Sequence, residues 1–291
     1  MGGAAVSSEV AALRALVERG GVVAITGAGV STASGIPDYR GVTGRTRTAP
    51  PMQWDEFAGS AAARQRYWAR GQVGFRRYAG IRPNPAHEAF AALEAHGLLD
   101  AVVTQNVDGL HRAAGSDVVV ELHGSLADVL CMSCGAREPR AALQARLDEA
   151  NPWLSEVQAP QQADGDAVLD DRHVAGFRVL GCRVCDGPLR PDVVFFGEFV
   201  PRERMARARD LVEAAATLLV AGSSLAVGSG RLLLRHARRH GAAVAIVNLG
   251  ATRGDDVADV RIEADVTEVL PRLVPLEGTS VAESGQGQEA G

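Results

Sequence analysis

Short runs of aliphatic and β-branched residues recur along the chain, separated by stretches with helical periodicity. The runs lie at Gly21–Thr26, Ala101–Thr104, Val118–Leu122, Leu218–Gly222 and Val244–Asn248. Continuous apolar runs of this length are typical of strands that are buried on both faces of a parallel sheet. Because helical segments alternate with them, the pattern predicts an α/β fold with a doubly wound, Rossmann-like parallel sheet.

The remaining patterns predict helices, loops and one edge strand. An N-terminal amphipathic helix is expected from the apolar face of Val10, Leu13, Leu16 and Val17. A second helix is expected over Pro83–His96, ended by Gly97. Residues 41–80 show no strand pattern and are expected to form loops and short helices. The run Pro191–Phe196 begins with proline, which is typical of a strand at a sheet edge.

Composition narrows the class of protein. The chain has 291 residues, 46% of them hydrophobic, which is enough for a large core. Its net charge of -5 argues against nucleic acid or an acidic membrane as partner. No apolar run reaches the roughly 18 residues that span a bilayer. The first residues, which include Glu9 and Glu18, resemble neither a signal peptide nor a transit peptide, so a cytoplasmic location with reduced thiols is expected.

All four cysteines of the chain lie in two CxxC pairs: Cys131, Cys134, Cys182 and Cys185. This pattern predicts one tetrahedral zinc site with four thiolate ligands. Such a site is closed to water and therefore structural. The gap between the pairs is longer than the usual ~15–20 residues, but the entropy of loop closure grows slowly with length. Four thiols without a metal are the alternative.

The turn after the first run carries the sequence Gly27-Ala28-Gly29. Glycines at this point allow backbone amides to approach a pyrophosphate at the start of a helix. The dinucleotide fingerprint of dehydrogenases has a third glycine where this chain has Thr32. A hydride-transferring dehydrogenase is therefore disfavoured.

Polar clusters follow the predicted strands and the glycine turn. They are Gly35–Gly41, Thr104–His111, Glu121–Gly124, Gly222–Ser224 and Asn248. Each alone is compatible with a cap or a turn. Together they indicate one ligand site at the carboxyl edge of the sheet, where α/β folds bind their ligands.

These clusters carry a resemblance to a known family. The segments GAGVSTASGIPDYRG, TQNVDGLH, ELHGS, the paired CxxC, PDVVFFGE, AGSSLAV and IVNLG, in this order, resemble the sirtuins from about Val22 to Leu273. The segments RQRYWAR, NPAHEAF and LRPDVVFFGE, with the long insert around Asp164–Asp166, are most similar to class II sirtuins.

The resemblance implies an NAD-dependent protein-lysine deacylase that transfers the acyl group to ADP-ribose and releases nicotinamide. It implies that His123 is the general base, acting through the ribose hydroxyls, a role that suits an imidazole. It also implies that Asn106 and Asp108 form the nicotinamide pocket and that Gln105 binds the adjacent ribose.

The remaining sites are implied in the same way. The cofactor-binding residues would be Gly27, Ala28, Gly29, Ser31, Asp38, Tyr39, Arg40, Gln105, Asn106, Asp108, Gly222, Ser223, Ser224, Asn248, Leu249 and Val266. Tyr39 stands where the family most often has phenylalanine. A substrate peptide would add a strand along Val194, Phe195, Phe196 and Gly197.

The acyl group is less defined by the sequence. Tyr67 and Arg70 share a helix face at i and i+3. A solvated helix surface is the ordinary explanation. An arginine in an acyl pocket can instead bind an acyl carboxylate with two hydrogen bonds, and this leads to the hypothesis that acidic or branched acyl groups are preferred over acetyl.

The expected organisation has four parts. Residues 1–40, 81–130 and 187–275 form the Rossmann-like NAD-binding domain, and 41–80 a cofactor-loop and helical segment. Residues 131–186 form an inserted zinc-binding module, in which 151–176 are a long insert of unassigned role, and 276–291 are a tail expected to be disordered. The basic residues are all arginine, so an acylated lysine must come from another protein.

Three other functions compete with the deacylase. They are an NAD-dependent protein ADP-ribosyltransferase, a non-catalytic NAD sensor and a zinc-ribbon binder of nucleic acid. The transferase is the main alternative because it would use the same nicotinamide pocket. The net charge argues against the nucleic-acid binder. The sequence does not define the oligomeric state.

Overall fold

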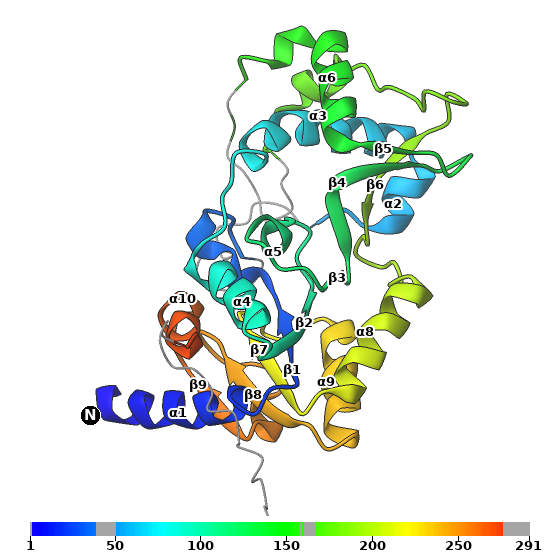
Figure 1. Ribbon diagram of the computed structural model, residues 1–291. Helices are drawn as coiled ribbons and strands as arrows, with labels where there is room; N and C mark the ends of the chain where they lie inside the picture. The colour runs from blue at the N-terminus through cyan, green and yellow to red at the C-terminus, as the bar shows by residue number, and fades with distance from the viewer. Residues whose placement is uncertain (1, 39–50, 158, 160–166, 276–291) are drawn as a thin grey trace, which may run out of the picture.

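The computed structural model describes residues 2–38, 51–157, 159 and 167–275, with side chains from residue 8 onward (Figure 1). Tyr39, Arg40 and the insert around Asp164–Asp166 lie outside these ranges, as does the tail from 276.

A six-stranded parallel sheet forms the larger module, in the order β3-β2-β1-β7-β8-β9. Its strands are β1 (Val22–Thr26), β2 (Leu99–Thr104), β3 (Val119–Glu121), β7 (Thr217–Ala221), β8 (Ala243–Val247) and β9 (Val260–Ile262). This order has the reversal of a Rossmann fold, and β1 and β7 are the neighbours at the point of reversal. Every residue of β1 and of β7 is buried, which explains their uninterrupted apolar sequences.

Helices cover both faces of this sheet. One face packs against α1 (Gly2–Val17), α4 (Pro85–Ala95), α10 (Val266–Val269) and the 3₁₀ helix Leu270–Leu273. The other packs against α8 (Arg202–Ala214) and α9 (Gly228–Arg239). Short helices follow the strands at α5 (Leu110–Ala113) and at the 3₁₀ turns Ala28–Val30, Thr32–Ser34 and Asp255–Val257. The doubly wound sheet predicted from the sequence is confirmed.

A smaller module lies at the opposite end of the molecule from α1 (Figure 1). It contains a three-stranded antiparallel sheet of β5 (Arg137–Pro139), β4 (Gly124–Cys131) and β6 (Leu189–Val193), in this order. Its helices are α2 (Trp54–Gly59), α3 (Ala61–Tyr78), α6 (Arg140–Ala150), α7 (Asp171–Ala175) and the 3₁₀ helix Pro152–Leu154. Phe57, Trp68, Leu143, Phe177 and Phe195 belong to its separate hydrophobic core.

Two expectations about this module differ from the structure. Residues 61–78 form one helix of 18 residues, whereas loops and short helices were expected; Ser60 caps it by accepting a hydrogen bond from the Ala63 amide. The expected module boundaries at 130 and 187 also divide the smaller sheet, because β4 begins at Gly124 and pairs with β6. The sequence around β6 does not indicate its partner, because β4 lies far from it along the chain.

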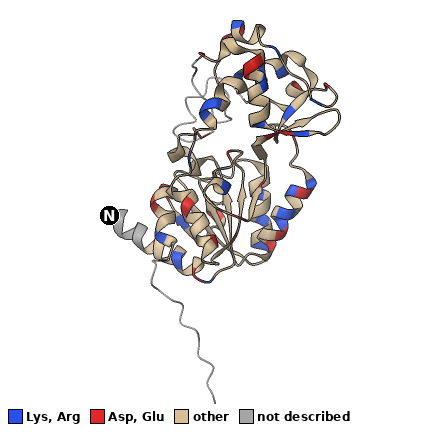
Figure 2. Cartoon of the chain, turned by 45° about the horizontal axis from the view of Figure 1, so that its top comes forward, with Lys and Arg blue, Asp and Glu red and all other residues tan. Residues whose placement is uncertain are grey.

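The polypeptide carries both signs of charge on both modules (Figure 2). Basic positions recur along α8, whose sequence RERMARARDLVEA also contains acidic residues. Among the described residues, no helix has the length and apolarity needed to cross a bilayer.

Candidate active site at the carboxyl edge of the sheet

Two glycine-containing loops meet at the carboxyl ends of β1 and β7. The Gly27 amide donates to the Ala221 carbonyl at 3.2 Å, and the Gly29 amide donates to the Gly222 carbonyl at 2.8 Å. A Cβ atom added to Gly29 would lie 2.8 Å from the Gly222 oxygen, and one added to Gly27 would lie 2.8 Å from the Ser223 Cβ. Only glycine permits this approach, so the two loops pack closely against each other at the edge of the sheet where a pyrophosphate binds in this fold.

Asn106 and Asp108 converge on Ser31, at the start of the same site. The Ser31 hydroxyl donates to Asp108 Oδ2 at 2.6 Å. The Asn106 amide nitrogen donates to the Ser31 oxygen and to the Gly27 carbonyl, both at 3.0 Å. Burial raises the pKa of Asp108, while the hydrogen bonds from Ser31 and the Leu110 amide oppose this shift. The structure therefore joins the predicted pocket residues in one hydrogen-bonded cluster.

His123 lies between β3 and β4, and both of its ring nitrogens have partners. Nδ1 lies 3.0 Å from the carbonyl oxygen of Gln105, and Nε2 lies 3.0 Å from the Ser229 hydroxyl. Burial lowers the pKa of His123, and the Gln105 carbonyl opposes this effect. A neutral imidazole with a lone pair on one nitrogen is the form that a general base requires.

Gln105 connects this imidazole to the loop after β7. Its backbone amide donates to the Thr26 carbonyl at 2.9 Å, and its side-chain oxygen accepts from the Ser223 hydroxyl at 2.8 Å. The next polar cluster includes Asn248, which is 7% exposed and donates to the carbonyls of Leu249 and Gly250.

The residues in the outer part of the predicted cofactor site differ in their exposure to solvent. Leu249 is 64% exposed, whereas Val266 is 3% exposed and belongs to the hydrophobic core at the start of α10. The carbonyl of Ser224 accepts from the Arg253 amide at 3.0 Å. Asp38 ends the first described range, and Tyr39 and Arg40 lie outside the described residues.

The segment after β6 is held on both sides. The Val194 amide donates to the His123 carbonyl at 2.8 Å, and Phe196 makes an isolated parallel bridge with Gln53. Regular pairing ends at Val193, although the sequence suggested a strand to Phe196. A salt bridge stabilises the turn: Arg190 donates to both Glu198 oxygens at 2.8 Å, and Glu198 accepts from the Phe195 amide at 3.0 Å.

Tyr67 and Arg70 differ in their surroundings. Tyr67 is 8% exposed and packs edge-on against Phe57, and its ring centroid lies 5.6 Å from that of Phe195. Arg70 is half-buried, and its Nε atom is buried with no hydrogen-bond partner among the described residues. Tyr67 thus belongs to an aromatic cluster that continues into the segment after β6.

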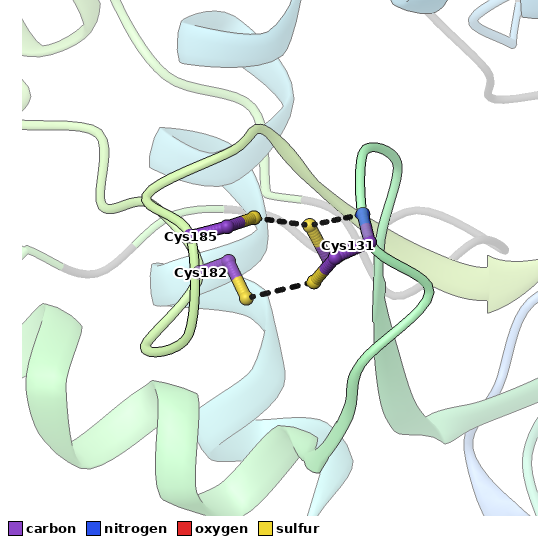
Figure 3. Close-up of side chains that lie close together, drawn as sticks. Cys131, Cys182 and Cys185 are labelled. Atoms are coloured by element: carbon purple, nitrogen blue, oxygen red, sulfur yellow. Dashed lines mark hydrogen bonds between the residues drawn. The ribbon is translucent and has the colours of Figure 1, made fainter.

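The four cysteine side chains converge between the β4–β5 turn and the loop before β6 (Figure 3). Their sulfur atoms lie within 4.8 Å of one another, with Cys131 to Cys185 at 3.5 Å and Cys134 to Cys182 at 3.8 Å. A tetrahedron with zinc–sulfur bonds of about 2.3 Å has sulfur–sulfur separations of about 3.8 Å.

The surroundings of the sulfur atoms also fit a metal. Backbone amides of Ser133 and Cys134 donate to the Cys131 sulfur at 3.4 Å, and the Val184 amide donates to Cys182 at 3.3 Å. Such donors stabilise negative charge on thiolates. The four cysteines are therefore positioned to bind one structural zinc ion, which would connect the two halves of the module.

Several residues near the site were not recognised from the sequence. Ser229 contacts His123, and Arg190 and Glu198 hold the segment after β6. Ser229 carries no motif of its own, since only folding brings the start of α9 to a residue 106 positions earlier. Arg190 and Glu198 both lie in the segment LRPDVVFFGE, but their pairing with each other was not predicted.

Comparison with known proteins gives concordant results. The family model of the Sir2 family matches residues 27–229. A protein of Streptomyces coelicolor, NAD-dependent protein deacetylase 1, is 48% identical over 278 residues, which are 96% of this chain and 93% of the relative. NAD-dependent protein deacetylase 3 of Pseudomonas syringae is 48% identical over 261 residues, covering 89% of this chain and 92% of its own length.

Solved structures are similar over the same range. A structure described as Sir2-p53 peptide-NAD+ has a TM-score of 0.69 and 32% identity, covering 89% of this chain and 94% of that chain. A complex of Sir2 with a deacetylated p53 peptide and 3′-O-acetyl-ADP-ribose has a TM-score of 0.70 and 30% identity, covering 90% and 96%.

Proposed function

Because the chain belongs to the Sir2 family, we propose how its own residues carry out the reaction of that family. The protein is an NAD-dependent protein-lysine deacylase, in which NAD supplies the ADP-ribose that accepts the acyl group and nicotinamide is released. The main structural support for this function is a cluster at the point where the strand order of the sheet reverses. In it, Ser31 is hydrogen-bonded to both Asn106 and Asp108, beside the Gln105–His123 pair.

His123 is assigned the role of general base. Its lowered pKa keeps the imidazole neutral near pH 7, and the Gln105 carbonyl accepts from Nδ1. The basic lone pair is thereby assigned to Nε2. At this nitrogen His123 removes the proton of a ribose hydroxyl, which increases the nucleophilicity of that oxygen toward the acyl carbon.

Asn106 and Asp108 are assigned to the carboxamide of nicotinamide. The amide of Asn106 is oriented by Gly27 and Ser31, and the carboxylate of Asp108 is oriented by Ser31 and the Leu110 amide. Groups that are oriented before binding lose little freedom when they bind, so more of their interaction energy goes into holding the ring.

The phosphates and the two riboses are assigned to the glycine-containing loops. Gly27 and Gly29 pack against Gly222 and Ser223 too closely for a Cβ atom, and a glycine turn between a strand and a helix is where this fold binds a pyrophosphate. Gln105 is assigned to the nicotinamide ribose and Asn248 to the adenosine ribose. Asp38, Tyr39, Arg40, Leu249 and Val266 remain predicted cofactor contacts on the family pattern.

The peptide is assigned to the segment Val194–Gly197. Its support is that the segment leaves the edge strand β6 directly beside His123, with one amide bonded to the His123 carbonyl. A substrate backbone that pairs along this segment would bring its modified lysine to the imidazole.

Tyr67 and Arg70 are assigned to the acyl group, with acidic or branched acyl chains preferred over acetyl. The aromatic contact of Tyr67 with Phe195 supports a place beside the peptide segment, and the unsatisfied Nε of Arg70 supports binding of an acyl carboxylate. Turnover of acetyl-, succinyl- and methylglutaryl-lysine peptides tests this preference. Fastest removal of acetyl, unaffected by Arg70→Ala, would contradict it.

We place the protein in the cytoplasm, because four thiolate ligands persist in a reducing compartment. Membership of class II is likewise proposed on the motifs around Trp68 and on the long insert.

The function is tested by incubating the zinc-loaded protein with NAD and acyl-lysine peptides. Mass spectrometry then follows nicotinamide, the peptide and acyl-ADP-ribose. Deacylated peptide and acyl-ADP-ribose in equal amounts support the deacylase. ADP-ribose on protein, with no acyl-ADP-ribose, would indicate an ADP-ribosyltransferase instead.

A further inference from the structure

The Ser229 hydroxyl lies on the nitrogen of His123 that must act as the base. The Gln105 carbonyl can only accept a hydrogen bond, so Nδ1 of His123 carries the proton in the neutral ring. Nε2 then bears the lone pair. The Ser229 hydroxyl, 3.0 Å away, is therefore the donor to this lone pair.

The position of Ser229 is determined by the structure around it. Leu225, which is 1% exposed, has a positive φ of 52°, a backbone conformation that is uncommon for a branched residue. Its amide donates to the Ser223 hydroxyl at 3.3 Å, and that hydroxyl donates to Gln105. This turn directs the chain back toward His123, where α9 begins.

The first turn of α9 packs directly on Gln105. A Cβ atom added to Gly230 would lie 3.0 Å from Nε2 of Gln105 and 3.1 Å from the Leu225 side chain. Glycine at this position lets the helix approach closely, and the approach brings the Ser229 hydroxyl to the imidazole. Two partners of the ring, Gln105 and Ser229, are thus fixed by one contact between the residue that follows β2 and the first turn of α9.

We propose that Ser229 is a positioning residue for His123, an inference that rests on the proposed role of His123 as base. Its hydroxyl donates to Nε2 in the free enzyme and holds the ring, together with Gln105, in one orientation and one tautomer. A ribose hydroxyl that reaches Nε2 takes the place of a donor that was already there. The base therefore needs no rotation or proton shift when the cofactor binds.

The proposal predicts an effect on one chemical step. Nicotinamide release does not require the base, whereas transfer of the acyl group to the ribose does. In Ser229→Ala the single-turnover rate of acyl-ADP-ribose formation is expected to fall about tenfold, a part of the roughly 10²–10⁴-fold that a general base contributes. Exchange of labelled nicotinamide into NAD at saturating peptide should stay within about twofold of the unchanged enzyme, because that step does not use the base.

Two further variants complete the design. Ser229→Thr keeps the hydroxyl and should restore most of the acyl-transfer rate. Gly228→Ala is the matched control, since an added Cβ there meets no atom within 4 Å. The protein with ¹⁵N-labelled histidine, without NAD, gives a readout besides activity: the Nε2 resonance of His123 should move in Ser229→Ala and remain in place in Gly228→Ala.

Three results would overturn the proposal. They are an unchanged acyl-transfer rate in Ser229→Ala, an unchanged Nε2 resonance, and equal slowing of both steps, which would mark a general structural role. The same assay with His123→Ala separates the two levels of inference. If acyl transfer survives without His123, the proposed base is wrong, whatever the Ser229 variant shows.

Discussion

The buried histidine pair His87–His111 should make the protein sensitive to mild acid. The two rings are 0% and 1% exposed and contact each other edge-on, with centroids 4.9 Å apart. Nδ1 of His87 accepts a hydrogen bond from the backbone amide of Asn84. Nε2 of His111 lies 2.9 Å from the Thr26 hydroxyl, at the end of β1. Burial lowers the pKa of His87 to about 4 and, together with the charge of His87, lowers that of His111 to about 3.

The sign of the effect follows from proton linkage. An unfolded histidine has a pKa of about 6.5, so the unfolded chain binds more protons than the folded one once the pH falls below this value. The contribution of the pair to stability is complete above about pH 6.5 and is lost as the pH falls toward the folded pKa values. pH 5 lies about 1.5 pH units below the pKa of an unfolded histidine, and each pH unit corresponds to about 1.36 kcal/mol. Each ring therefore lowers the free energy of unfolding by about 2 kcal/mol at this pH. The pair therefore lowers the free energy of unfolding by about 4 kcal/mol between pH 8 and pH 5.

Urea unfolding of the zinc-loaded protein at several pH values measures this loss. The variant His87→Gln/His111→Gln can be less stable at every pH, but its unfolding free energy should change by about 4 kcal/mol less between pH 8 and pH 5. The exposed His240→Gln serves as control and should retain the full pH dependence. An equal pH dependence in the double variant and the unchanged protein would show that the stability lost in acid comes from groups other than His87 and His111.

Three further predictions follow from contacts in the structure. Cys182→Ser, or a strong chelator, should release zinc and lower the melting temperature by more than 5 °C, because four converging thiols lose their common ligand; the zinc content and thermal unfolding check this. Gly29→Ala should cost about 1–3 kcal/mol and raise the KM for NAD, because the new methyl group meets the Gly222 carbonyl; retention of both wild-type values would contradict it. Arg190→Ala should raise the peptide KM several-fold, because Glu198 loses its salt-bridge partner in the turn beside the proposed peptide segment, and should leave nicotinamide exchange at saturating peptide unchanged; equal kinetics with and without the arginine would show that the turn needs no salt bridge.

The larger module was predictable from the sequence because short stretches of neighbouring residues determine its strands and helices. The strands β1, β7 and β8 are short apolar runs, and a polar or glycine residue marks the carboxyl end of each. The helix predicted over Pro83–His96 is present as α4, whose start is set by Pro85 and the capping Asn84. In parallel sheets the carboxyl ends share one edge, so the polar clusters could be assigned to one site before their contacts were known.

The smaller module was less predictable. In α3 the buried residues include Tyr67, Trp68 and Gln72, which mix apolar and polar types, and the helix also contains Gly71 and Gly74. Its stability comes from packing onto the core around Phe57 and Phe177, which a local pattern does not contain. The β4–β6 pairing likewise joins segments separated by the whole zinc-binding region.

Within the site, residue types were predictable but partners were not. The motif around Asn106 and Asp108 indicated a polar pocket, yet the hydroxyl that joins them comes from Ser31, about 75 residues earlier. The contact of Ser229 with His123 depends on an uncommon turn at Leu225, which no sequence rule predicts.

The proposed reaction moves the acyl group of a protein lysine to ADP-ribose, with His123 as the general base that activates the ribose hydroxyl. The most direct test incubates the unchanged protein and His123→Ala with NAD and a panel of acyl-lysine peptides, and quantifies acyl-ADP-ribose by mass spectrometry. This product is expected to form in equal amount with deacylated peptide, and its formation should fall by at least about 10²-fold in His123→Ala, while zinc content and folding stay unchanged. Equal product from both proteins, or none from the unchanged protein with any acyl group, would contradict it.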